Sequence, residues 1–183
     1  MEIGINMTSF TKRGHGLRYG ERAYKKIKEQ GFSFIDFDVS ALAEQNLAKE
    51  EAERIILHEK ELILAAGLLV SQTHGPGHNI VTDSTPEGRC ARLEVMKKAL
   101  YYCYLLDCKY MVVHPIMPLG WSDRKMEDNR ATFDINVEYY KELLKSIGQP
   151  IEIVCQNMGK SLDDLEMIDP DYNSVYLLKS AVT

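Results

Sequence analysis

Two apolar segments that each end on a histidine constrain the fold of this chain more than any other feature. The first segment is Leu68–His74, and the second, Tyr110–Pro115, follows about 40 residues later. A continuous apolar run of this length predicts a buried strand, and the glycine or proline after each histidine favours a loop before the amphipathic segment that follows. A strand, a polar end and a helix therefore occur in the same order twice.

The same order of strand and helix recurs along most of the chain. Apolar runs predict five strands, at residues 2–6, 32–37, 68–73, 110–114 and 151–155. Apolar residues at helical spacing predict helices between them, over about 19–30, 49–66, from about 86 onwards and over about 133–147. A short helix near 162–168 and a weak sixth strand at 175–178 complete the expected elements.

Helix boundaries have clear signals in three places. Gly31 and Gly67 follow the ends of two expected helices, where glycine is a typical C-terminal stop. Ser84-Thr85-Pro86-Glu87 predicts the start of another helix, because proline suits the first turn and Ser-x-x-Glu is a capping box.

The repeat predicts an α/β fold built on a parallel sheet. Consecutive strands joined by a helix must run in the same direction, since a right-handed crossover returns the chain to the same end of the sheet. No stretch rich in Gly, Ser or Pro divides the sequence, so we expect residues 1–183 to form a single domain.

Composition narrows the class of partner. The chain has 183 residues, a formal net charge of -5 and a pI near 5.6, which argues against a nucleic-acid partner because that affinity needs clustered Lys and Arg. We expect no membrane span and no signal peptide, hence a cytoplasmic protein with a small-molecule ligand. The cysteines form no Cys-x-x-Cys pair and are interpreted as reduced core thiols; they are Cys90, Cys103, Cys108 and Cys155.

Polar residues stand at the carboxyl ends of the expected strands, where α/β proteins bind ligands. They would form a ring at one mouth of the sheet: Asn6, Asp36, His74, His114, Gln156 and Asn157. Strand alternation places His74 on one side with Gln72 and Val70. A single buried histidine is more often a hydrogen-bonded core residue, but two at equivalent strand ends favour a shared binding site.

Two further segments have both a functional and an ordinary interpretation. The basic loop Thr11–Arg18 either holds an anionic group such as a sugar phosphate or is solvated surface. Trp121 either supplies an apolar wall for a sugar ring or covers the end of the sheet.

Four segments resemble the xylose isomerase-like TIM barrel superfamily, which contains sugar and sugar-phosphate isomerases and epimerases and the related apurinic endonucleases. They are Gly31–Asp36, Thr73–Gly77, Val112–Pro115 and Ile153–Met158, and the resemblance covers residues 1–158. It implies proton transfer on a carbohydrate with a divalent metal such as Mn, Mg, Zn or Co. It also implies the substrate-binding residues, namely His74, His114, Asp36, Asn157, Asn6 and Trp121.

The chain departs from this family at the fifth strand. The family motif there is Glu-Asn-Met, with a glutamate that binds the metal, and this chain has Gln156 instead. A glutamine oxygen is a weak metal ligand, and the amide has no proton that ionises near neutral pH. The remaining metal ligands of the family come from later strands, which this sequence does not supply.

Length gives a second departure. A complete barrel of this type takes ~250 residues, so we expect a partial barrel of about five to six strands, incomplete at the C-terminus. The unpaired edges of such a sheet invite pairing. Either two chains form a homodimer through these edges, or the sequence is a truncated, possibly frameshifted, form of a longer protein.

Three functions remain open at this point. The first is a sugar or sugar-phosphate isomerase/epimerase-like protein with little or no turnover of its own. The second is a non-catalytic carbohydrate-binding module that dimerises. The third, an apurinic endonuclease, is disfavoured by the acidic charge and the missing ligands.

Overall fold

The computed structural model describes residues 3–7, 20–77, 82–83, 85–116, 126–146, 151–155 and 177–179. The elements within these ranges, in chain order, are β1 (Gly4–Asn6), α1 (Glu21–Glu29), β2 (Phe34–Asp38), α2 (Ser40–Ala43), α3 (Lys49–Ala65), β3 (Leu69–His74), α4 (Pro86–Leu105), β4 (Tyr110–Val113), α5 (Met126–Lys145), β5 (Glu152–Cys155) and β6 (Leu177–Lys179). The expected short helix near 162–168 lies outside the described residues.

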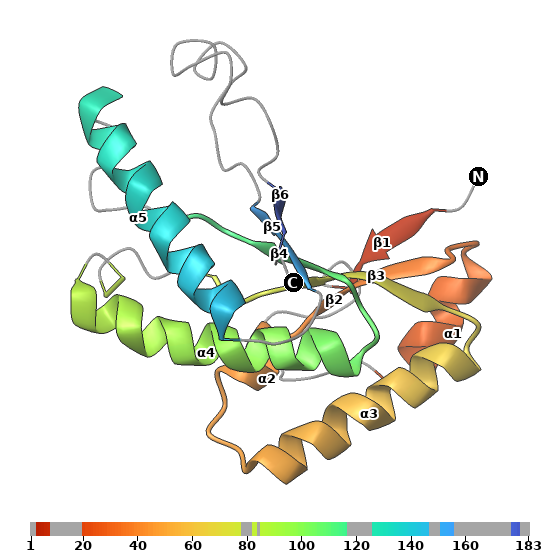
Figure 1. Ribbon diagram of the computed structural model, residues 1–183. Helices are drawn as coiled ribbons and strands as arrows, with labels where there is room; N and C mark the ends of the chain where they lie inside the picture. Colours follow the sequence, from red (N-terminus) through yellow and green to blue (C-terminus); the bar gives the residue numbers. More distant parts are fainter. Residues whose placement is uncertain are drawn as a thin grey trace.

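The strands form one open sheet in the order β1-β2-β3-β4-β5-β6. Strands β1 to β5 are parallel to their neighbours, and helices α1, α3, α4 and α5 connect them (Figure 1), which confirms the α/β class and the partial barrel. Strand β6 pairs antiparallel with β5. The expectation that the sixth strand continues the parallel repeat is therefore wrong, because a strand can pair with its neighbour in either direction.

The helix ends agree with the sequence signals except at the N-cap of α4. Gly31 and Gly67 have φ of +89° and +73°, in the left-handed region that suits a glycine stop. Thr85, rather than Ser84, is the N-cap of α4, and its Oγ1 accepts a hydrogen bond of 3.0 Å from the Gly88 amide. Pro86 occupies the first turn as predicted.

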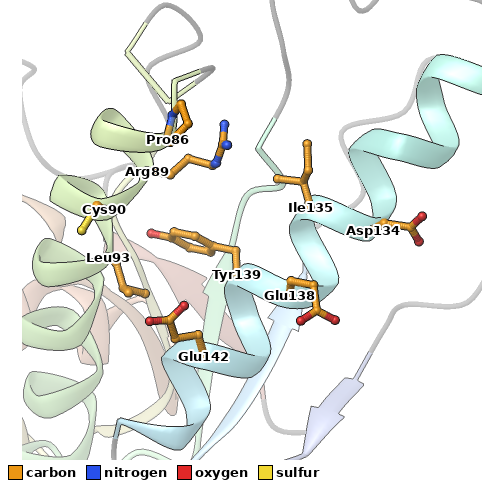
Figure 2. A pocket seen from close by; sticks show the side chains of 9 residues that line it. All are labelled: Pro86, Arg89, Cys90, Leu93, Asp134, Ile135, Glu138, Tyr139 and Glu142. Carbon is orange, nitrogen blue, oxygen red and sulfur yellow. The ribbon is translucent and has the colours of Figure 1, made fainter.

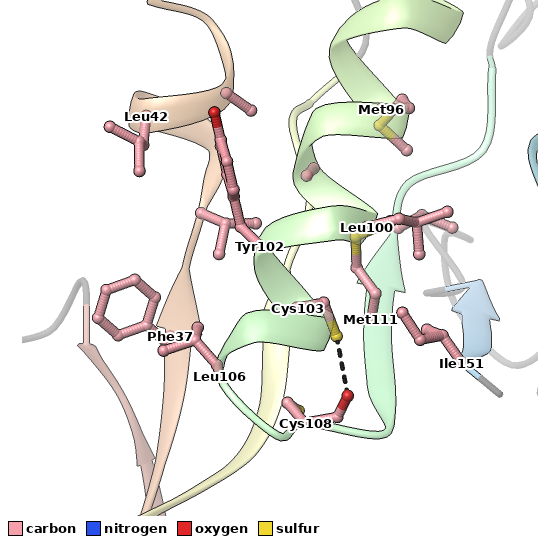
Figure 3. Packing of buried hydrophobic residues seen from close by; sticks show 14 of the residues in the cluster. Phe37, Leu42, Met96, Leu100, Tyr102, Cys103, Leu106, Cys108, Met111 and Ile151 are labelled. Atoms are coloured by element: carbon pink, nitrogen blue, oxygen red, sulfur yellow. Dashed lines mark hydrogen bonds between the residues drawn. The ribbon is translucent and has the colours of Figure 1, made fainter. Parts of the chain in front are cut away.

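The main core lies between the sheet and the helices. Five side chains on the helix-facing side of the strands have no exposed surface, namely Ile35, Phe37, Met111, Val113 and Ile153. Helix α4 supplies much of the opposite layer, through Met96, Leu100 and Cys103 (Figure 3). This apolar layer packs against the helix-facing side of the strands.

A bulge in β3 changes which of its residues share a face. Ile35 pairs with Val70 and Asp36 pairs with Gln72, so Ser71 is passed over. Val70 therefore lies on the helix-facing side with Ile35. The expectation that it shares a side with Gln72 and His74 is wrong, because the extra residue interrupts the alternation.

Candidate functional site

Asp36 is the centre of a hydrogen-bonded cluster on the inner face of the sheet, the face opposite the helices. The register aligns Asn6, Asp36 and Gln72 on three adjacent strands. Oδ2 of Asp36 accepts hydrogen bonds from Asn6 Nδ2 at 2.7 Å and from Gln72 Nε2 at 3.1 Å. It also contacts His74 Nδ1 at 2.9 Å. Three neighbouring side chains thus converge on one carboxylate oxygen.

The two imidazoles continue this network. An ionised carboxylate only accepts hydrogen bonds, so we assign the proton of His74 to Nδ1, which leaves Nε2 as an acceptor in the neutral ring. His114 Nε2 lies 3.3 Å from His74 Nε2, and the ring centroids are 5.4 Å apart at 79°. His114 therefore donates through Nε2. Its backbone oxygen accepts a 2.5 Å hydrogen bond from the Tyr140 hydroxyl, which ties the end of β4 to α5.

The charge of Asp36 follows from its contacts. Burial raises the pKa of this carboxyl, but the hydrogen bonds from His74, Gln72 and Asn6 lower it by more, and the net pKa is below its ordinary value. Asp36 is therefore ionised at neutral pH.

Asp36 also has one oxygen that the cluster does not use. The residue is only 8% exposed, and Oδ1 has no hydrogen-bond partner within the described part of the chain. A buried carboxylate oxygen without a partner is costly. A ligand that donates a hydrogen bond to Oδ1 would remove this cost.

The structure brings together four of the residues that the sequence predicts for the site: Asn6, Asp36, His74 and His114. Trp121, Gln156, Asn157 and the loop Thr11–Arg18 lie outside the described residues. Gln72 was not predicted as a site residue, although its alternation with His74 along β3 places it on the same face. The binding roles of all these residues stay predictions.

The described residues alone do not assemble a metal site. Among them no group of three or more His, Cys, Asp or Glu side chains is placed to hold a metal ion. His74 and His114 offer two nitrogens, whereas Mg²⁺ prefers several oxygens, and of the Asp36 oxygens Oδ2 already contacts three neighbours.

A cavity of about 480 Å³ lies elsewhere, between α4 and α5 (Figure 2). Its lining consists of Pro86, Arg89, Cys90, Leu93, Asp134, Ile135, Glu138, Tyr139 and Glu142. None of the residues around Asp36 belongs to this lining, so the cavity is separate from the cluster.

The described helices include none that is long and apolar enough to cross a membrane.

Comparisons with known proteins find similar folds among solved structures. No family model matches the sequence, and no curated protein matches it. The structure is similar to 3-keto-D-glucoside 4-epimerase from E. coli, with a TM-score of 0.58 and 16% identity over 94% of this chain and 65% of that one. It is also similar to a xylose isomerase-like TIM barrel protein from Mycobacterium smegmatis solved with magnesium, with a TM-score of 0.59 and 16% identity over 94% and 61% of the two chains.

A third similar structure is D-psicose 3-epimerase with D-tagatose from Clostridium cellulolyticum H10, with a TM-score of 0.59 and 17% identity. The match covers 79% of this chain and 48% of that one. The chain thus spans between about half and two thirds of the length of these three proteins. Its fold is similar to part of the TIM barrel in these structures.

Proposed function

We propose that this chain binds a sugar or sugar phosphate at the cluster of Asn6, Asp36, Gln72, His74 and His114. The observation that carries the proposal is Oδ1 of Asp36, which has no hydrogen-bond partner among the described residues and lies beside two imidazoles at the carboxyl ends of parallel strands. Similar folds include an epimerase solved with D-tagatose, which supports a carbohydrate as the class of ligand.

The chemistry of the cluster suits a polyol. A sugar hydroxyl both donates and accepts, so one hydroxyl can donate to Asp36 Oδ1 while a neighbouring oxygen accepts from an imidazole N–H. His74 and His114 contact each other at 3.3 Å, and a ligand oxygen would replace this long contact with a shorter one. The cluster would therefore orient adjacent hydroxyls.

The same contacts argue for binding with little turnover. Isomerisation requires a base that removes a proton from the carbon next to a carbonyl. Asp36 is a weak base because its pKa is lowered and three neighbours hold its Oδ2. Gln156, in the position of the family glutamate, has no ionisable proton. Asp36 thus serves to position His74 and the ligand.

A dimerising carbohydrate-binding module is the second candidate. Strand β1 stands at the end of the strand order, and on the inner face Leu69 and Tyr110 are 52% and 36% exposed. Exposed apolar side chains beside a strand edge favour association. A second copy of this chain would cover both features.

One set of measurements separates these functions. We would titrate the protein with D-tagatose, D-fructose and a fructose phosphate while following the imidazole signals of His74 and His114 by NMR. Binding should shift both signals, and His114→Gln should abolish the shift. His58→Gln is the matched control because His58 is an exposed residue of α3.

Two readouts accompany the titration. Deuterium uptake from D₂O into the bound sugar would reveal proton transfer, and we expect little or none. Sedimentation velocity would reveal the dimer of the second candidate. Unchanged imidazole signals at saturating concentrations of all three sugars would rule out the proposed binding site.

A further inference from the structure

The C-terminal end of α4 brings two cysteines together. The amide of Cys108 donates to the carbonyl of Cys103 at 3.1 Å, and the amide of Asp107 donates to the carbonyl of Tyr104 at 3.0 Å. Asp107 has φ of +53°. These features define a Schellman motif, in which the side chains at the positions of Cys103 and Cys108 pack against each other. Any two apolar residues would satisfy this packing, so the two thiols are an additional feature.

Both sulfur atoms approach the same backbone oxygen. Tyr110 O lies 3.7 Å from Cys103 Sγ and 3.4 Å from Cys108 Sγ. Cys103 Sγ also donates to Cys108 O at 3.3 Å (Figure 3). Thiols are weak donors, so these contacts do not hold the sulfurs firmly apart. The two thiols therefore share one small volume beside the start of β4.

Cys108 is the more reachable of the two thiols. It is 4% exposed and Cys103 is 0% exposed, but Cys108 lies between Asp107 and Lys109, whose side chains are 79% and 57% exposed. Local opening of such a surface turn exposes Cys108 without unfolding the core. The hydrogen bond from Cys103 also holds the pKa of Cys108 below its ordinary value, whereas the contact with Cys108 and burial raise the pKa of Cys103.

We propose that Cys103 and Cys108 form a reversible intramolecular disulfide when a hydroperoxide such as hydrogen peroxide reaches the turn. The Cys108 thiolate attacks one peroxide oxygen, the O–O bond breaks, and Cys108 becomes a sulfenic acid as hydroxide leaves and takes up a proton. The Cys103 sulfur then displaces the hydroxyl group as water. The two thiols lose two protons and two electrons, and the peroxide is reduced to two waters.

The sequence allows a direct test on the unmodified protein. Trypsin releases residues 99–109 as one peptide that contains both cysteines, whereas Cys90 falls in a separate peptide because Arg89 precedes it. Folded protein would be exposed to hydrogen peroxide, then denatured, alkylated and digested. We expect peptide 99–109 to lose about 2 Da and to resist alkylation until a thiol reductant restores it.

Two variants sharpen the result. Cys90→Ser should leave the mass loss unchanged, and Cys103→Ser should remove it and leave Cys108 oxidised by one oxygen. The proposal is overturned if both thiols of peptide 99–109 are still alkylated after a peroxide treatment that oxidises Cys90. A mass loss that appears only in urea would overturn it equally, and neither outcome depends on whether Cys103→Ser folds.

Discussion

The two faces of the sheet differ in how completely they are covered. On the helix-facing side, Ile35, Phe37 and Met111 have no exposed surface. On the inner face, Leu69 and Tyr110 are 52% and 36% exposed. Since burial of apolar surface is the main source of stability, the helix-facing side stabilises the fold and the inner face contributes less.

The polar cluster around Asp36 lies on the less covered face. The hydrogen bonds to Asp36 from Asn6, Gln72 and His74 all form there. On a fully packed face, every polar atom of a cluster would need a hydrogen-bond partner within the protein. On this less covered face, a polar atom such as Asp36 Oδ1 is available to a ligand. The helix-facing side of the sheet therefore supplies most of the stability, and the inner face holds the proposed binding cluster.

The largest expected effect comes from the covered face. Phe37→Ala removes a fully buried ring and should lower the free energy of unfolding by about 3–5 kcal/mol, because a packed core relaxes only partially around the cavity that is left. Leu69→Ala, on the exposed inner face, should cost roughly 1 kcal/mol or less. Urea denaturation measures both. Equal losses in the two variants would show that the faces do not differ in stability.

Acid should lower the free energy of unfolding through Asp36 on the inner face, by less than Phe37→Ala lowers it. Asp36 has a pKa below its ordinary value of 3.8, so the folded state favours the charged form. The stability from this carboxylate is present above that ordinary value and is lost as the pH falls through the lower pKa of the folded protein. Urea denaturation between pH 7 and pH 3 should show this loss.

Asp36→Asn is the variant that isolates this effect. It removes the ionisable group, so the loss of stability in acid should be smaller than in the original protein. Asp107→Asn is the control, since the Asp107 side chain is 79% exposed. An Asp36→Asn protein that loses stability in acid as steeply as the original would contradict the assigned role.

Much of the fold could be predicted from the sequence because the apolar runs and helical spacings are regular. The strand ends placed Asn6, Asp36, His74 and His114 at one mouth, where the structure has them in contact. The direction of β6 could not be predicted in this way, since a three-residue strand has no periodicity that distinguishes parallel from antiparallel pairing.

The bulge at Ser71 could not be predicted from the sequence pattern either. Strand alternation assumes one residue on β3 for each residue on β2, and the step from Ile35 to Asp36 takes two. The error affects only residues before the bulge. Gln72 and His74 were assigned correctly to one face, whereas Val70 was not.

The smallest expected effect tests this assignment directly. Val70→Thr keeps the shape of the side chain but places a hydroxyl on the helix-facing side, where Val70 packs against the core, and should cost about 1 kcal/mol. Leu69→Thr, on the open inner face beside Phe34, should cost less, although it removes more apolar atoms. If urea denaturation instead showed the larger loss for Leu69→Thr, the alternation would run uninterrupted through Ser71. The inner face would then carry more of the stability than the structure indicates.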